Sequence, residues 1–162
     1  MAKAYAHRTE PGTPWADLVV EPRGSGWHVF VAWPCPDRRA NTTTDVNRFS
    51  DAAAILAPAT PDAPMMTMGN QDAPVDGWLW RADREGGIRV TARGFGTSER
   101  LDLPARTTIT AAWSNGLWGV GFDVPGWESL RRQMLIGVAV WQGVAAERAG
   151  LKSVSTNWIT VQ

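Results

Sequence analysis

The sequence has few of the residues that build common catalytic and metal sites. It contains one cysteine, Cys35, and two histidines, His7 and His28, among 162 residues. One thiol cannot form an internal disulfide, and two distant histidines are too few for a zinc site. No nucleophile–base–acid set, phosphate loop or carboxylate pair for glycoside chemistry stands out. We therefore expect no catalysis by this chain alone, and a structural role for Cys35 in a turn between two prolines.

An excess of one charge and long apolar runs are also missing. The 16 basic and 16 acidic residues cancel, and the isoelectric point is near 6.7. Nucleic-acid-binding surfaces are basic, so no nucleic-acid partner is expected. No run approaches the ~20 apolar residues that span a bilayer, and the start of the chain lacks the apolar core of a secretory signal. We expect a cytoplasmic protein or one on the cytoplasmic face of a membrane complex. Periplasmic location by co-export with a signal-bearing partner is the alternative.

Lysine is as rare as histidine. There are 16 basic residues and only two are lysines, so 14 are arginines, and Lys152 is the one lysine outside the polar start of the chain. A guanidinium stays protonated and offers a metal no lone pair, whereas a buried amine can lose its proton and bind iron. Lys152 is therefore either a metal ligand or an ordinary solvated residue of a surface loop.

Methionine and tryptophan, in contrast, are concentrated. Met65, Met66 and Met68 lie within a proline-rich loop, where there is little core to fill. They are either apolar anchors of that loop or thioether ligands. Ten tryptophans provide flat surfaces for a core, a ligand stack or a partner interface. Two interpretations follow: a protein that holds a cofactor, or a cofactor-free, tryptophan-rich module that binds carbohydrate or a partner protein.

Short apolar stretches between Gly, Pro and Asn turns predict an all-β protein with little helix. Strands are expected over residues 15–21, 27–33, 76–83, 88–93, 107–113, 117–124, 135–142 and 154–161, and residues 48–57 fit a helix or a buried strand. Asn115–Gly116 is a strong hairpin signal, and residues 125–133 fit one helical turn. We expect a flexible tail over residues 1–14 and one antiparallel β-sandwich or flattened barrel over residues 15–162.

Two segments of the chain carry a recognisable pattern. The first holds Asp51, Met68, Gly69, Pro74, Val75, Trp78, Trp80, Arg81 and Ala82, and the second holds Ala139, Trp141, Gly143, Glu147, Arg148, Lys152, Ser153, Ser155 and Trp158. Together they resemble the haem b, or gamma, subunits of type II molybdoenzymes of the dimethylsulfoxide reductase family. Those enzymes convert ethylbenzene, dimethylsulfide, selenate or chlorate, and nitrite oxidoreductases have related subunits.

The resemblance implies a β-sandwich with haem b between its two sheets and iron held by one methionine and one lysine. The lysine would be Lys152. The methionine would be Met68, because it precedes Gly69, with Met66 and then Met65 as alternatives.

Further side chains are implied around the cofactor. Trp80 and Trp141, with Trp78 and Trp158, would pack on the porphyrin or else form ordinary core. Arg81 and Arg148 are candidates for holding the propionates.

The resemblance also implies partners. A haem with both axial positions filled moves electrons and does not react with oxygen readily. The chain would be a non-catalytic electron-transfer subunit in a complex with a molybdenum-cofactor catalytic subunit and an iron–sulfur subunit. A cytochrome c or a membrane quinone-reactive subunit would exchange electrons with it. The substrate and the direction of electron flow depend on those partners.

Overall fold

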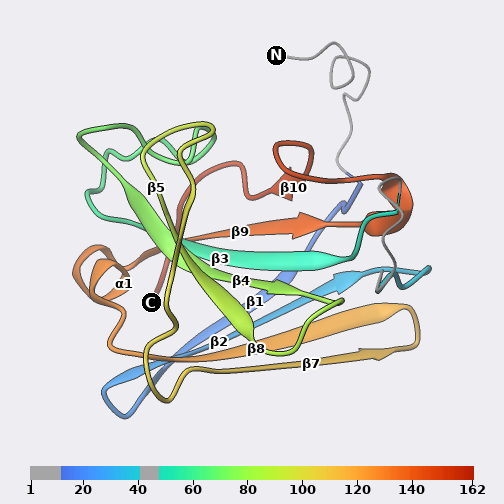
Figure 1. The fold of residues 1–162 in the computed structure, drawn as a ribbon. Helices are drawn as coiled ribbons and strands as arrows, with labels where there is room; N and C mark the ends of the chain where they lie inside the picture. Colours follow the sequence, from blue (N-terminus) through green and yellow to red (C-terminus); the bar gives the residue numbers. More distant parts are fainter. Residues whose placement is uncertain (1–11, 41–47) are drawn as a thin grey trace.

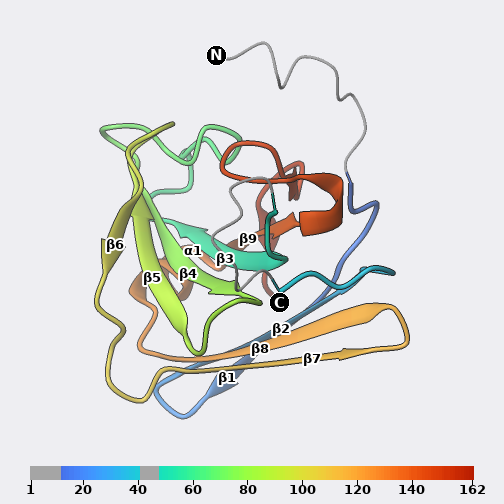
Figure 2. The ribbon, with the colours of Figure 1, turned by 45° about the vertical axis from the view of Figure 1, so that its right-hand side comes forward.

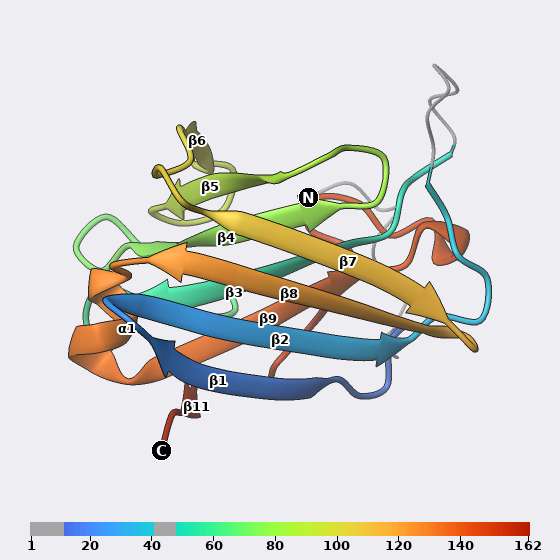
Figure 3. The ribbon, with the colours of Figure 1, turned by 90° about the horizontal axis from the view of Figure 1, so that it is seen from below.

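The computed structural model, which describes residues 12–40 and 48–162, confirms the predicted all-β sandwich. One sheet has four strands in the order β1 (Asp17–Arg23), β2 (Gly26–Pro34), β8 (Leu117–Pro125) and β7 (Thr108–Ser114). The other has β10 (Ser153–Val154), β9 (Leu135–Trp141), β3 (Ala52–Pro58), β4 (Val75–Arg81), β5 (Gly87–Ala92) and β6 (Glu99–Leu101), and β11 (Ile159–Thr160) also pairs with β9. The two sheets stack face to face (Figures 1 and 3).

Several local predictions can be compared with the structure. The ambiguous stretch at 48–57 contains strand β3, which pairs with β4 on one edge and β9 on the other. The single strand expected over 154–161 is instead two short strands, β10 and β11, because a bend at residues 156–157 interrupts it. Of the tail predicted over residues 1–14, residues 1–11 lie outside the described residues. Thr13 is buried and hydrogen-bonded, so the tail does not extend that far.

The helices that the structure describes are short. The expected helical turn is α1 (Glu128–Gln133), and 3-10 helix η2 (Gly143–Ala145) follows β9. Within the described ranges, no helix is long and apolar enough to cross a membrane.

Tryptophan fills the space between the two sheets. Trp33, Trp78, Trp80, Trp118 and Trp127 all belong to this buried core. The ring centroids of Trp80 and Trp118 are 4.8 Å apart in an edge-to-face arrangement. Such pairs stabilise by about 0.5–1.5 kcal/mol beyond the area that they bury. The interior of the sandwich is therefore already packed with side chains.

Strand β3 is buried on both faces, which is unusual in antiparallel sheets because one face is commonly solvated. Ala53, Ile55 and Ala57 face the sandwich core. The alternating residues Ala52 and Ala54 face the other side of the seven-stranded sheet. There the loop between β3 and β4, the loop between β5 and β6 and the loop before β10 lie over the sheet (Figure 2). This second covered space contains the candidate site.

Candidate functional site

A pocket of about 630 Å³ lies on the face of the seven-stranded sheet that points away from the four-stranded sheet. Its floor consists of Ala52, Ala54 and Leu56 of β3, Leu79 of β4 and Ala139 of β9. Ala54 is paired with Leu79 on one side and Ala139 on the other. The alanines keep the floor low and apolar. The volume is within the ~300–1,000 Å³ typical of small-molecule and cofactor sites.

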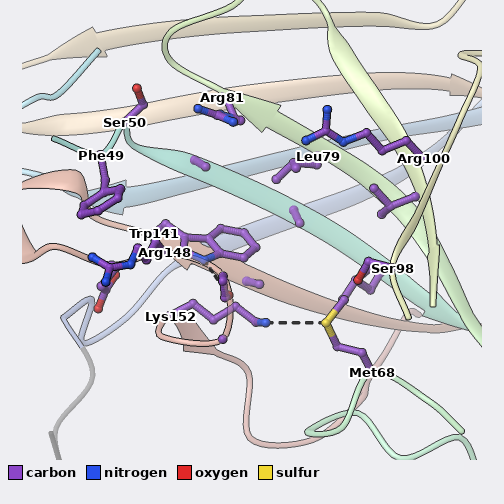
Figure 4. Close-up of a pocket in the computed structure, with 18 of the residues that line it drawn as sticks. Phe49, Ser50, Met68, Leu79, Arg81, Ser98, Arg100, Trp141, Arg148 and Lys152 are labelled. Carbon is purple, nitrogen blue, oxygen red and sulfur yellow. Dashed lines mark hydrogen bonds between the residues drawn. The ribbon is translucent and has the colours of Figure 1, made fainter. Parts of the chain in front are cut away.

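Met68 and Lys152 meet above this floor. Met68 Sδ lies 3.6 Å from Lys152 Nζ, and both side chains line the pocket (Figure 4). Met68 comes from the loop between β3 and β4, and Lys152 from the loop before β10, 84 positions later in the sequence. The fold therefore brings together the two donors that the sequence made most conspicuous.

The Lys152 amine is in a desolvated position. Burial lowers its pKa below the ordinary value of 10.5. Nζ lies 5.3 Å from the centroid of the Trp141 ring. No carboxylate of the described residues forms an ion pair with it. Desolvation favours the neutral amine, which is the form that has a lone pair for a metal.

The backbone conformation at Met68 directs its side chain. Its φ is +60°, in the left-handed region that residues other than glycine rarely adopt. The Met68 N–H donates to the Met65 carbonyl (3.0 Å), and its carbonyl accepts from the Gly94 N–H (3.0 Å). Gly69 follows with φ +81°, where a Cβ would lie 2.6 Å from the Ala73 carbonyl oxygen. Glycine is thus required at 69. The left-handed backbone of Met68 is strained, and such strain often marks a functional position.

The two alternative methionines lie elsewhere. Met66 is 60% exposed. Met65 is buried over Gly137 of β9 and accepts a hydrogen bond from Ser155 Oγ (3.4 Å). Neither lines the pocket. Of the three candidates, the structure places Met68 beside Lys152.

The predicted tryptophans separate into two groups. Trp141 lines the pocket, and its Nε1 donates to the Ala149 carbonyl (3.1 Å). Trp158 donates to the Ala63 carbonyl and does not line the pocket. Trp78 and Trp80 lie on the opposite face of β4, in the sandwich core. Only Trp141 of these four is therefore placed to contact a ligand in the pocket.

The candidate site lies on a different face of the seven-stranded sheet from the one that the resemblance implied. The resemblance placed haem between the two sheets, but tryptophan and aliphatic side chains fill that space. Met68 and Lys152 face the opposite side of the seven-stranded sheet. The two-residue period of a strand shows that Trp78 and Trp80 share a face, but it does not show which face meets the other sheet.

Arginines lie at different sides of the pocket (Figure 4). Arg81 lines it but is engaged with Asp83 through two hydrogen bonds of 2.7 and 3.0 Å. Arg148 also lines it and lies over the Phe49 ring, 4.5 Å from its centroid. Arg100 of β6, which the sequence did not indicate, lines the pocket as well. The fold turns Arg100 toward the site.

The donor set fits a haem. One thioether and one amine are fewer than the three or four protein ligands that hold zinc, and they are not the oxygen ligands that calcium takes, so they suit a metal whose macrocycle supplies further ligands better than a bare ion. Met68 Sδ and Lys152 Nζ are 3.6 Å apart, so the two atoms converge on one point of the pocket. The apolar floor suits a porphyrin, and arginines suit its carboxylates.

Comparison with known proteins gives a consistent result. No protein-family model matches the chain. It is 34% identical over 150 residues to the chlorate reductase gamma subunit of Ideonella dechloratans (84% of this chain, 60% of the relative). It is 33% identical over 165 residues to the dimethylsulfide dehydrogenase gamma subunit of Rhodovulum sulfidophilum (90% and 60%). It is 35% identical over 142 residues to a Haloferax mediterranei protein named as a respiratory nitrate reductase haem subunit (79% and 49%). The chain thus spans 49–60% of the length of these relatives.

Proposed function

Because the chain is a homologue of the gamma subunits of chlorate reductase and dimethylsulfide dehydrogenase, we propose that it is the haem b electron-transfer subunit of a molybdenum oxidoreductase complex. One observation carries the proposal. Met68 Sδ and the desolvated Lys152 Nζ lie 3.6 Å apart above an apolar floor.

The chemistry of the two ligands suits electron transfer. A bound haem supplies reversible one-electron chemistry at its iron. Met68 and Lys152 would both hold the iron. The soft, neutral thioether of Met68 would raise the reduction potential. Keeping an amine of ordinary pKa neutral at pH 7 costs about 4–5 kcal/mol. The desolvated position of Lys152 and its bond to iron would offset that cost.

Other pocket residues have assignable roles. Trp141 would pack against the macrocycle beside Lys152. Arg100 and Arg148 line the pocket, and no ion pair with a described carboxylate engages either one. Their guanidinium groups would bind the haem propionates by charge-assisted hydrogen bonds.

The proposal extends to the rest of the complex. By analogy with the named gamma subunits, the chain would assemble with a molybdenum-cofactor catalytic subunit and an iron–sulfur subunit. It would exchange electrons with a cytochrome c or a membrane quinone-reactive subunit and would catalyse no step itself. We propose a cytoplasmic location or the cytoplasmic face of a membrane complex, with periplasmic co-export as the alternative. Fractionation of cells that produce the whole complex tests this.

The haem-free carbohydrate-binding interpretation has less support. Stacking of sugars requires exposed aromatic faces. All ten tryptophans fall within the described ranges, and Trp15, at 49%, is the exposed one, while the others are buried or partly buried. The described surface therefore offers one exposed tryptophan, Trp15, and no cluster of exposed tryptophans.

Absorption spectra test the proposed function. The chain, produced with ample haem and its partner subunits, should show a Soret band and, after dithionite, the sharp α and β bands of six-coordinate low-spin haem b. Lys152→Arg should be nearly as damaging as Lys152→Ala, because a guanidinium offers no lone pair. Lys3→Arg, the same change at the other lysine, is the control. A colourless wild-type protein would contradict haem binding, and a normal spectrum in Lys152→Arg would remove Lys152 from the iron.

A further inference from the structure

The buried polar side chains of the described chain gather in one region. They are Thr13, Ser50, Asp51, Gln142, Glu147 and Ser153, each at most 8% exposed. Burial of a polar group costs free energy unless its hydrogen bonds are made. Gln142 follows β9 directly, and Glu147 and Ser153 flank Lys152 in the next part of the chain. Thr13 and Asp51 are hydrogen-bonded to these segments, and Ser50 precedes Asp51. Their concentration indicates a place where fixed geometry is required.

Gln142 is the centre of this network. Its Nε2, which carries two N–H groups, lies within hydrogen-bonding distance of three acceptors: Thr13 Oγ1 (2.8 Å), the Gly12 carbonyl (3.0 Å) and the Pro34 carbonyl (3.1 Å). Its backbone N–H donates to Glu147 Oε2 (2.8 Å). Gln142 thus contacts the segment Gly12–Thr13 through its side chain and the loop that follows β9 through its backbone N–H.

The segment Gly12–Thr13 contacts the Lys152 loop at two points. The Gly12 N–H donates to Glu147 Oε1 (3.2 Å), before Lys152. The Thr13 N–H donates to Ser153 Oγ (2.9 Å), directly after Lys152. The loop is therefore fastened on both sides of the ligand by a segment distant in sequence.

The loop itself has a backbone that needs such support. Ala146 and Ala149 have φ values of +56° and +50°, in the left-handed region that alanine rarely adopts. Strained residues of this kind persist where surrounding contacts hold them. The Trp141 indole, which donates to the Ala149 carbonyl, provides one such contact, and the network provides the others.

We propose that Thr13, Gln142, Glu147 and Ser153 are positioning residues for Lys152. They fix the backbone of its loop so that the amine, on a flexible four-carbon chain, stays directed at Met68. This inference rests on the proposed function, since it concerns the lifetime of the lysine–iron bond. A purely structural network would affect folding without affecting that bond.

Carbon monoxide binding to the reduced haem measures how often an axial ligand leaves the iron. Thr13→Val removes the Oγ1 acceptor, Thr13→Ser keeps it, and Ser153→Ala removes the acceptor of the Thr13 N–H. Thr110→Val makes the same change as Thr13→Val at an exposed position of β7. Loss of one buried hydrogen bond corresponds to about a tenfold change. We expect Thr13→Val and Ser153→Ala to bind carbon monoxide about tenfold faster, with spectra shifted toward that of Lys152→Ala and unchanged haem content. Thr13→Ser and Thr110→Val should match the wild type.

Hydrogen exchange of the chain without haem gives a second readout. Peptides covering residues 143–152 should exchange about tenfold faster in Thr13→Val than in Thr13→Ser, since the same hydrogen bond is lost. Equal carbon monoxide rates in Thr13→Val, Ser153→Ala and their controls, or equal exchange in this loop, would overturn the inference. If Thr13→Val does not fold, Ser153→Ala decides. A wild type without haem, or a Lys152→Ala variant with the wild-type spectrum, overturns the proposed function instead.

Discussion

The three neighbouring methionines differ in placement, and this difference makes the thioether ligand testable. Met68 lines the pocket, Met66 is exposed and Met65 covers Gly137. Met68→Leu should therefore abolish the six-coordinate spectrum and lower the haem reduction potential, because leucine has similar volume but no sulfur. Met66→Leu, as the control, should leave both unchanged. Met65→Leu should alter stability by less than about 1.5 kcal/mol and leave the spectrum intact.

Absorption spectra and redox titration of the three variants make this comparison. A normal spectrum in Met68→Leu, with a changed one in Met65→Leu or Met66→Leu, would transfer the ligand role to the other methionine.

Cys35 should be chemically inert. Burial, followed by the nearby Asp51 charge, raises its thiol pKa from 9.0 to about 12. The thiolate is the reactive form, so iodoacetamide at pH 8 should label the folded protein at least tenfold more slowly than the protein in urea. Between pH 9 and 12 the unfolded chain loses this proton first, so Cys35 lowers the stability as pH rises in that window. Equal labelling rates in the two states, followed by mass spectrometry, would contradict the buried placement.

Single residues were predictable where chemistry made them unusual. Lys152 stood out among arginines, Met68 by its place before Gly69, and the structure puts both in the pocket with Trp141. Trp80 lies in the sandwich core instead, and Arg100 was not foreseen. The position of Trp80 depends on which face of its strand meets the other sheet, and the position of Arg100 depends on where an edge strand folds. Neither property is set by the local sequence.

At the scale of elements, the Met68 loop depends on the backbone freedom of Gly69. Gly69→Ala should weaken haem binding, because its Cβ would lie 2.6 Å from the Ala73 carbonyl oxygen and would displace Met68. We expect a loss of at least about tenfold, as for disturbing an outer-shell partner of a ligand. Gly24→Ala is the matched control, since Gly24 also has positive φ (+59°) but nothing within 4 Å of a Cβ.

Titration of each haem-free variant with haem measures this effect. Both variants should lose roughly 1 kcal/mol of stability in urea from the left-handed backbone, and only Gly69→Ala should lose haem affinity. Equal haem affinities would show that the loop can adjust without moving Met68.

Elements were predicted well where a local signal exists. The Asn115–Gly116 turn does join two strands, β7 and β8. The stretch 48–57 remained ambiguous because alanine suits a helix, and only pairing on both edges makes it strand β3. The break between β10 and β11 was missed, although the bend falls on Thr156 and Asn157, and asparagine is a residue that favours turns.

At the scale of the whole molecule, the seven-stranded sheet has two covered faces. One face packs on the tryptophan core, and the other forms the floor of the pocket. The sandwich was predictable from the spacing of short strands. The position of the site was not, because the apolar run of β3 shows that both faces are covered without showing what covers each one. The covering loops come from distant parts of the chain.

Haem should stabilise the whole fold, because the pocket is built from strands and loops throughout the chain. A ligand at a thousandfold excess over its dissociation constant stabilises by about 4 kcal/mol. For a domain of this size that corresponds to a rise in Tm of roughly 8–16 °C. Calorimetry with and without haem measures the shift, and Lys152→Ala at the same haem concentration should show a smaller one. An unchanged Tm of the wild type would contradict a specific haem site.

The most direct test of the central claim is the position of the iron in a crystal of the haem-loaded chain, located by its anomalous scattering. We predict one iron peak on the outer face of the seven-stranded sheet, within bonding distance of both Met68 Sδ and Lys152 Nζ. An iron between the two sheets, among Trp33, Trp80 and Trp118, or one without Met68 and Lys152 as ligands, would contradict this site.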